Sequence, residues 1–359
     1  MHFNAHIEIT IAGKLLKTIV AFNSKFDGHS IGGECEIIVP LNSRIQYVDG
    51  KNDYLTAYSK VLFNVGDSVL VRSKYEGYDW NIEFDGFIYD FKEGTPLTIK
   101  CLDYVYFFNL GIFGSKRVLL KKNTKSKKSS PSVGCSFKLI SLYALLQHLV
   151  DFVNDTIDVT SSSANHVELI LPIPEMNLEN VTFAMMCPSA ILEWIKKELG
   201  FNISLIGNNL YVNVASNTLD KIEYTTSRNV KSSELQKAGA AFTMYKVKAW
   251  FIRNDGTKDS FEVGNSNGQL REVFFYRVKR DAGIYEKMAL EALEKVKQMK
   301  YNGNISTYLY PFPKLFAKAI YTDKRYPDKN ANYVITYIET DISSSGYQRT
   351  LKLSFLSEI

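Results

Sequence analysis

Leu97-Thr98-Ile99-Lys100-Cys101-Leu102-Asp103 alternates apolar and polar side chains, which is the pattern of a strand with one face against a core. The residues before it repeat this pattern, with turns rich in glycine and aspartate between the repeats. An opening hairpin is predicted over residues 3–22, with its turn at Ala12-Gly13. Further strands are predicted over residues 35–39, 68–72 and 80–91. Several short strands of this kind predict a barrel or a sandwich.

The period of the apolar residues changes after residue 103. Residues 139–154 are apolar on most faces of a helix, which is typical of a helix buried between domains. A second helix is predicted to begin at Pro188 and to end at Gly200, because proline is favoured in a first turn and glycine just after a last one. Residues 201–206 and 210–214 then predict a hairpin.

Strands return after residue 216, and one amphipathic helix is predicted over residues 282–300. Strands are expected over residues 242–252, 260–263, 272–278, 305–310, 333–340 and 349–355. The last strand-turn-strand, residues 333–355, repeats the pattern of residues 84–101. We therefore predict an α+β fold that is mainly β. Two antiparallel β-barrel-like domains, residues 1–105 and 216–359, flank an α/β middle domain with helices, residues 106–215.

The length and composition are those of an ordinary globular protein with several domains. A chain of 359 residues corresponds to about 2.4 domains. A hydrophobic fraction of 45% and a charged fraction of 23% exclude collagen-like and disordered proteins. The aromatic fraction of 13% is high and favours sheet. Residues 139–153 form the longest apolar stretch, which is too short and too polar to cross a bilayer.

The positive charge of the chain is local. The formal net charge is +5, and no acidic residue lies between Asp103 and Asp151. That stretch holds eight basic residues: Lys116, Arg117, Lys121, Lys122, Lys125, Lys127, Lys128 and Lys138. The rest of the chain has 35 basic residues against 38 acidic ones, which argues against a nucleic-acid-binding surface over the whole molecule. An exposed basic loop is predicted over residues 116–136, and five of its lysines are the candidate contacts for a polyanion or a partner: Lys121, Lys122, Lys125, Lys127 and Lys128.

One enzyme motif matches by letter. Gly28-His29-Ser30-Ile31-Gly32 fits the G-x-S-x-G turn that exposes a nucleophilic serine between a strand and a helix. The residues that follow predict a strand, so the scaffold for this chemistry is missing. The five histidines have no metal-ligand spacing, and the four cysteines form no CxxC pair and are predicted to be free thiols in the core. The sequence therefore predicts no catalytic residue, no cofactor and no metal site.

The order of the elements resembles the bacteriophage tail (baseplate) hub family, the late control D-type proteins. The same fold occurs at the start of type VI secretion spike proteins and of tail-associated lysins. The resemblance covers nearly the whole chain and rests on pattern and order, without a catalytic signature. Its segments are Gly66-Asp67-Ser68-Val69-Leu70-Val71, Phe84-Asp85-Gly86-Phe87-Ile88 and residues 97–103, then Leu199-Gly200-Phe201 and Leu210-Tyr211-Val212, then Tyr301-Asn302-Gly303-Asn304-Ile305, Tyr333-Val334-Ile335 and Gly346-Tyr347-Gln348-Arg349-Thr350-Leu351.

This resemblance implies a structural protein of a virion tail, assembled in the bacterial cytoplasm. It implies a homotrimer in which two barrels per subunit form a ring with pseudo-sixfold symmetry. Such a ring joins the tail tube or a distal tail protein to a spike or fibre, and it encloses a channel for the tape-measure protein and for DNA. The many tyrosines are then expected at seams between subunits. The sequence stops at Ile359, directly after the second predicted barrel, which argues against an attached cell-wall hydrolase.

Two alternatives stay open at this point. The first is a tail-associated hydrolase, which either degrades the cell wall or uses Ser30 as an esterase does. The second is a nucleic-acid- or carbohydrate-binding module that uses the lysine-rich loop, whose affinity would fall steeply with salt.

Overall fold

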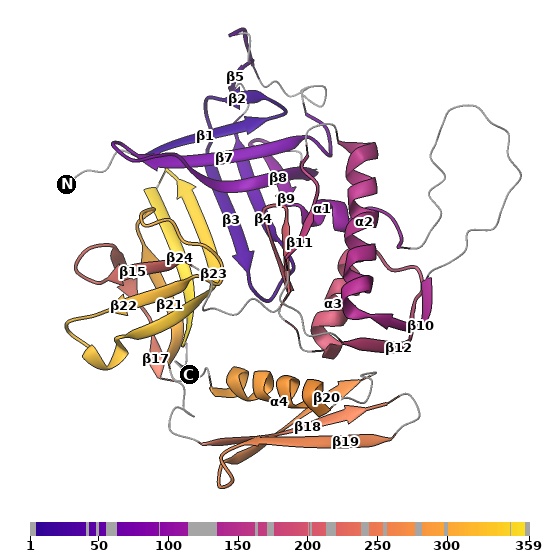
Figure 1. Cartoon of the computed structure of the whole chain (residues 1–359). Helices are drawn as coiled ribbons and strands as arrows, with labels where there is room; N and C mark the ends of the chain where they lie inside the picture. The colour runs from indigo at the N-terminus through magenta and orange to yellow at the C-terminus, as the bar shows by residue number, and fades with distance from the viewer. Residues whose placement is uncertain are drawn as a thin grey trace, which may run out of the picture.

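In a computed structural model, alternating buried and exposed side chains build one large sheet from both ends of the chain (Figure 1). Its strands pair antiparallel, except for one parallel pair near the end of the chain. The fold is mainly β, with helices gathered in the middle of the sequence, and this confirms the predicted class. The structure describes residues 5–40, 43–47, 50–54, 63–92, 94–113, 135–161, 164–170, 176–199, 201, 203–212, 220–237, 244–253, 257–276, 282–297, 301–344 and 346–355.

The first third of the chain forms a curved run of strands in the order β3-β4-β9-β8-β7-β1-β2-β5-β6. Ile99 and Cys101 of the segment 97–103 are fully buried, so its predicted strand is confirmed. The strands are β1 (Ala5–Ile11), β2 (Lys14–Leu16), β3 (Ala21–Asp27), β4 (Gly33–Val39), β5 (Arg44–Gln46), β6 (Asn52–Tyr54), β7 (Ser68–Tyr75), β8 (Asn81–Lys92) and β9 (Leu97–Leu102).

The last third of the chain contributes a second run of strands, in the order β16-β21-β24-β23. The strand β22 pairs with β23 and with β15, and β17 pairs with β21. The elements are β15 (Lys221–Thr225), β16 (Val230–Ser233), β17 (Gln236–Lys237), β21 (Tyr301–Thr307), β22 (Lys318–Thr322), the short 3-10 helix η3 (Pro327–Lys329), β23 (Ala331–Ser343) and β24 (Gly346–Phe355).

The two runs are joined edge to edge through β3 and β23. These strands pair antiparallel over seven residues, with Tyr337 opposite Asp27 and Ser343 opposite Ala21. The result is one sheet of sixteen described strands. The predicted barrels are not confirmed, because no pairing among the described strands closes the sheet on itself. The edge of β3 that would be needed to close the first run is occupied by β23.

The middle of the chain packs its helices beside the first run of strands, on the side away from β21–β24 (Figure 1). Helix α2 (Leu142–Thr160) begins three residues later than the sequence pattern predicts, because residues 135–141 pair with β12 (Asn177–Phe183). The Ser141 hydroxyl caps the helix by accepting from the Ala144 amide at 3.1 Å. The elements are α1 (Val105–Asn109), β10 (Cys135–Ser141), α2 (Leu142–Thr160), β11 (Glu168–Ile170), β12 (Asn177–Phe183), α3 (Pro188–Leu199), β13 (Ile203–Ile206) and β14 (Asn209–Val212).

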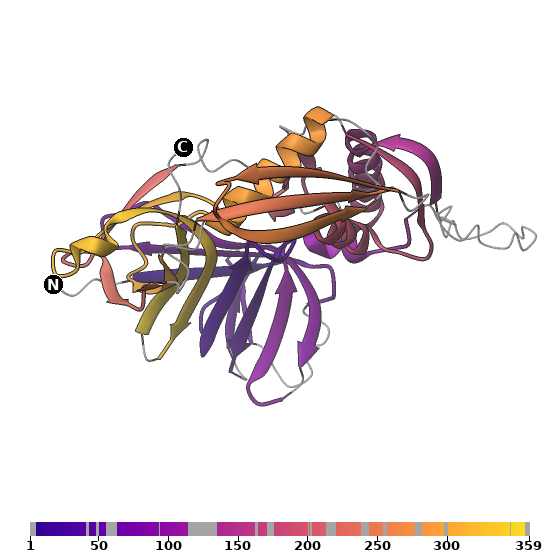
Figure 2. The same cartoon turned by 90° about the horizontal axis from the view of Figure 1, so that it is seen from below.

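A separate three-stranded sheet lies beneath these layers in Figure 1 and in front of them in Figure 2, with one helix across a face of it. It consists of β18 (Tyr245–Ile252), β19 (Lys258–Gly264) and β20 (Gln269–Tyr276), and the helix is α4 (Ala282–Lys297). Tyr285 of α4 stacks on Phe251 with ring centroids 3.8 Å apart, and both side chains belong to the same hydrophobic core as α2 and α3. These strands, which the sequence pattern groups with the second barrel, therefore add nothing to the large sheet.

The described residues bury three hydrophobic cores, one for each run of the large sheet and one for the helices together with β18–β20 and α4. The division at residues 105 and 215 stays a prediction. Cys35 and Cys101 are buried as expected, whereas Cys135 and Cys187 are only half-buried. None of the described helices is long and apolar enough to span a membrane.

Candidate functional site

The five lysines predicted to contact a polyanion or a partner lie outside the described residues. Lys121, Lys122, Lys125, Lys127 and Lys128 all fall within residues 114–134. Among the described residues, four features bear on function: a cavity beside Ser30, a buried ion pair between the two runs of the large sheet, a polar face of that sheet, and a cluster of exposed aromatic side chains.

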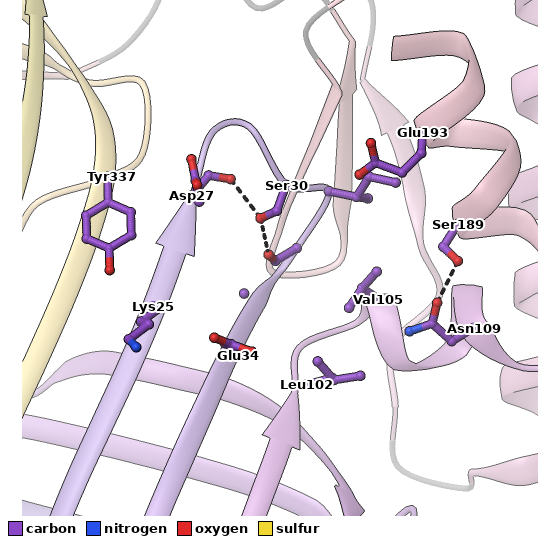
Figure 3. Close-up of a pocket in the computed structure, with 13 residues that line it drawn as sticks. Lys25, Asp27, Ser30, Glu34, Leu102, Val105, Asn109, Ser189, Glu193 and Tyr337 are labelled. Atoms are coloured by element: carbon purple, nitrogen blue, oxygen red, sulfur yellow. Dashed lines mark hydrogen bonds between the residues drawn. The ribbon is translucent and has the colours of Figure 1, made fainter. Parts of the chain in front are cut away.

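Ser30 borders a cavity of about 500 Å³ at the ends of β3 and β4 (Figure 3). The cavity is also lined by residues of α1, α3 and β23. The Ser30 hydroxyl lies 2.9 Å from the Asp27 carbonyl oxygen and 2.7 Å from the Gly32 carbonyl oxygen, so its single hydrogen is donated within its own loop. The strand β4 follows it where the nucleophile motif requires a helix.

The groups around Ser30 hold the loop in place. None of the thirteen residues that line the cavity is a histidine. The ammonium group of Lys196 on α3 donates to the carbonyl oxygens of Gly28 at 3.3 Å and Ser30 at 3.1 Å. The cavity also contains the carboxylates of Asp27, Glu34 and Glu193, but the Ser30 hydroxyl donates to carbonyl oxygens and not to a base, so it is not an activated nucleophile in this arrangement. The geometry is that of a structural clamp between the β3–β4 loop and α3.

The buried carboxyl group of Asp103 contacts the end of the β3–β4 loop. Asp103 is 2% exposed and accepts hydrogen bonds from the backbone amides of Gly33 at 2.6 Å and Val105 at 2.9 Å. Burial raises the pKa of Asp103 to about 7, although the two hydrogen bonds act in the opposite direction. A Cβ atom at Gly32 would lie 2.4 Å from a carboxyl oxygen of Asp103, so the close approach requires glycine. Asp103 thus fixes the starts of β4 and α1 together.

The two runs of the large sheet are also connected by an ion pair in the interior. Arg349 of β24 is fully buried and donates from one terminal nitrogen to both oxygens of Glu83 on β8, each at 2.6 Å. The other terminal nitrogen of Arg349 donates to the Leu309 carbonyl oxygen, and its Nε donates to the Thr340 hydroxyl at 3.2 Å. Ser73 and Thr340 donate further hydrogen bonds to Glu83. Every charge of this pair therefore has partners, as burial requires.

One face of the large sheet is polar across the junction of the two runs. In the register, Lys25 of β3 lies opposite Glu34 on one side and Glu339 on the other, and its ammonium group is 3.6 Å from the Glu339 carboxylate. The register puts many polar side chains on one face, and we use the name polar face for ten of them: Asn23, Lys25, Glu34, Glu36, Lys100, Glu339, Asp341, Gln348, Thr350 and Lys352. It carries four carboxylates and three amines. The opposite face builds the hydrophobic cores.

Exposed aromatic side chains gather where the turn between β7 and β8 meets the loop after β21. Tyr78 and Tyr310 have ring centroids 4.8 Å apart and are 46% and 50% exposed. The Lys74 ammonium group lies 4.7 Å from the centre of the Trp80 ring. We call Tyr78, Trp80 and Tyr310 the aromatic edge. Rings with one apolar side and one wet side are common at protein interfaces.

Among the described residues, no group of three or more histidine, cysteine, aspartate or glutamate side chains is placed to hold a metal ion. The residues of the buried ion pair were not singled out by the sequence analysis. The signal was nonetheless present, because Arg349 occupies a position in phase with the apolar residues Leu351 and Leu353 of the same strand. A charge on the apolar side of a strand indicates a buried partner.

No family model and no curated protein matches the sequence. The fold, in contrast, matches solved structures over nearly the whole chain. A tail protein from Neisseria meningitidis MC58 has a TM-score of 0.62 at 11% identity, with 98% of this chain and 96% of that chain covered. The 43 kDa tail protein of prophage MuSo2 from Shewanella oneidensis has a TM-score of 0.59 at 13% identity, with 98% of each chain covered. The chain has a phage tail hub-like fold.

A protein of a secretion system has a similar fold. The E. coli c3393 protein, a component of the type VI secretion system described as similar to the T4 tail proteins gp27 and gp5, has a TM-score of 0.53 at 9% identity. The alignment covers 98% of this chain and 77% of that chain. At these identities the likeness establishes the hub-like fold alone, so the function is argued below from the residues.

Proposed function

We propose that this protein is a structural subunit of a phage tail hub. The observation that carries the proposal is the β3–β23 pairing, which makes one continuous sheet from the two ends of the chain. Shape and symmetry are what an adaptor of this kind contributes, and a rigid sheet supplies a fixed shape. The known tail proteins with the same fold support this role.

In this proposal three copies form a ring, and each copy contributes the two runs of its large sheet. Six similar sheet segments then surround a central channel with pseudo-sixfold symmetry. The ring joins the tail tube or a distal tail protein to a spike or fibre, and the tape-measure protein and later DNA pass through it. The protein would accordingly be assembled in the bacterial cytoplasm and located in the virion tail.

The polar face is the part of the molecule best suited to line the channel. A wall with four carboxylates and three amines presents a slightly negative surface, so it repels rather than holds the phosphates of passing DNA. The aromatic edge is the part best suited to a seam between subunits, because Tyr78, Trp80 and Tyr310 are exposed in the single chain. Both assignments use surfaces that the hydrophobic cores leave free.

The hydrolase alternative gains no support from Ser30, whose hydroxyl donates to carbonyl oxygens of its own loop. A role without catalysis is therefore preferred. The predicted basic loop remains a candidate contact for a polyanion or for a neighbouring tail protein, through Lys121, Lys122, Lys125, Lys127 and Lys128. In this proposal the chain has three domains, residues 1–105, 106–215 and 216–359.

Light scattering and electron microscopy of the purified full chain test the proposal together. The expected result is a trimer whose class averages have threefold symmetry and a central hole. A matched pair of variants tests the seam: Tyr78→Ser with Tyr310→Ser should reduce trimer formation, whereas Tyr326→Ser, which changes an equally exposed tyrosine elsewhere, should not. A protein that stays monomeric at every concentration would overturn the proposal.

A further inference from the structure

Two buried cysteines lie directly opposite each other on central strands of the large sheet. Cys35 of β4 and Cys101 of β9 are register partners and are 3% and 0% exposed. The strand β4 lies between β3 and β9, and β9 lies between β4 and β8, so neither strand is at an edge. The proposed tail function uses neither thiol.

The backbone geometry places these cysteines within reach of a disulfide. The Asp103 amide donates to the Gly33 carbonyl oxygen at 3.0 Å, which marks that pair of opposed residues as hydrogen-bonded. Hydrogen-bonded pairs alternate along an antiparallel ladder, so Cys35 and Cys101, two residues further on, form the next such pair. Their Cα atoms are then about 5.5 Å apart, which is inside the range that disulfides occupy.

The two side chains share the same hydrophobic core. Burial raises the pKa of the Cys35 thiol well above its usual value, with smaller contributions from the neighbouring Cys101 and from Glu36 and Glu34. Because the thiolate is the nucleophile, a buried thiol with a raised pKa reacts slowly while the core stays closed. A small neutral oxidant can still enter a core when it opens locally.

We propose that Cys35 and Cys101 are a thiol pair that hydrogen peroxide converts into a reversible cross-strand disulfide. The sulfur of one cysteine attacks the O–O bond of the peroxide and becomes a sulfenic acid, while the departing oxygen leaves as water. The sulfur of the second cysteine then displaces the hydroxyl group of the sulfenic acid, which takes the thiol proton and leaves as a second water. Two thiols and one peroxide thus give one disulfide and two waters.

The bond is expected to be easily reduced. Opposed residues of an antiparallel pair have Cβ atoms about 4.5–5.5 Å apart, whereas a relaxed disulfide holds them at about 3.8 Å. The strands must therefore shift slightly to form the bond, and such strained disulfides are the more reducible ones. The half-buried Cys135 and Cys187 do not lie opposite another cysteine in any described strand pairing.

The test treats the folded full chain with increasing hydrogen peroxide, alkylates the remaining thiols after unfolding, and maps the peptides without reductant. The expected product lacks two alkylation sites, has lost two hydrogens, and contains one crosslinked peptide that joins Cys35 to Cys101. Dithiothreitol should restore both sites. The double variant Cys135→Ser with Cys187→Ser should give the same crosslink, and Cys35→Ser should lose it.

Several outcomes would overturn the proposal. These are sulfinic or sulfonic acid at Cys35 or Cys101 without a crosslink, a crosslink that includes Cys135 or Cys187, or unchanged thiols at peroxide levels that crosslink the chain in urea. The wild-type peptide map alone distinguishes these results, so the test does not depend on whether the Cys35→Ser variant folds. A failure here would leave the proposed tail function untouched, since trimer formation is measured separately.

Discussion

Arg349 and Glu83 form a two-oxygen ion pair that bridges the two runs of the large sheet from within. Both donor-acceptor distances are 2.6 Å, and both side chains are almost completely shielded from water. Glu83 lies on β8 and Arg349 on β24, which are separated by 266 positions in the sequence. The pair therefore fixes how the first and last thirds of the chain are oriented relative to each other.

Removal of one partner of this pair should cost far more stability than removal of a surface pair. Glu83→Gln leaves the buried guanidinium without its counter-charge, and we expect a loss of about 3–5 kcal/mol in the free energy of unfolding. Arg349→Met should have a similar effect. The double variant should lose less than the sum of the two single losses, because the energies of contacting residues do not add. Urea unfolding followed by circular dichroism measures all three.

The exposed pair of Lys314 and Asp220 provides the control. Both side chains are 62% exposed, so Asp220→Asn should change the free energy of unfolding by less than about 1 kcal/mol. If Glu83→Gln were as mild as this control, the ion pair would not hold the two runs together.

Stability should fall as the pH rises, because of Asp103. The pKa of its carboxyl group is raised from 3.8 to about 7 by burial, so the folded state binds this proton more tightly than the unfolded state does. The resulting stabilisation is complete below about pH 3.8 and is lost as the pH rises through about 7. Between pH 5 and 8 the loss should be on the order of 2 kcal/mol.

The variant Asp103→Asn isolates this effect. The amide oxygen can still accept one of the two backbone hydrogen bonds, but the side chain no longer titrates. Urea midpoints measured at several pH values should therefore fall less steeply with pH in the variant than in the wild type. Equal slopes would show that other groups are responsible.

Ser30→Ala should act on stability and not on catalysis. Its hydroxyl contacts two carbonyl oxygens of its own loop, so the loss of this contact should cost about 1 kcal/mol. Hydrolysis of a p-nitrophenyl ester and of purified cell walls should be the same in the variant and the wild type. A wild-type activity that disappears in Ser30→Ala would revive the hydrolase alternative.

Reversal of charge on the polar face should create DNA binding. Glu34→Lys, Glu36→Lys and Glu339→Lys together turn a slightly negative face into a strongly positive one. We expect the triple variant to bind duplex DNA with an affinity that falls steeply with salt, while the wild type does not bind. Fluorescence anisotropy at several salt concentrations measures this.

Single changes of equal charge make the comparison specific, with Glu36→Lys on the polar face and Glu286→Lys on α4. Glu286 is exposed on that helix, away from the large sheet, and Glu286→Lys adds positive charge there. It should leave DNA binding nearly unchanged. Equal binding by both variants would mean that net charge, and not the polar face, is responsible.

Local patterns in the sequence were sufficient to predict many strands and the helix that begins at Pro188. They were insufficient for the pairing of β3 with β23, because alternation shows which face of a strand is buried but not which strand lies beside it. The start of α2 was misplaced for a similar reason, since residues 139–141 suit a helix by composition but pair with β12. The position of Arg349 among the apolar residues of its strand indicates a buried partner, but the sequence does not show that Glu83, 266 positions away, is that partner.

The pairing of β3 with β23 also governs the order in which the protein can fold during synthesis. Asn23 and Glu339, which hydrogen-bond across these strands, are 316 positions apart. The outer edge of β3 therefore stays unpaired during synthesis until nearly the whole chain has been made. The unpaired backbone groups of such an edge can pair with strands of other chains. Lys25 and Asp27 place charges along β3, and these charges oppose pairing with other chains before β23 has been synthesised.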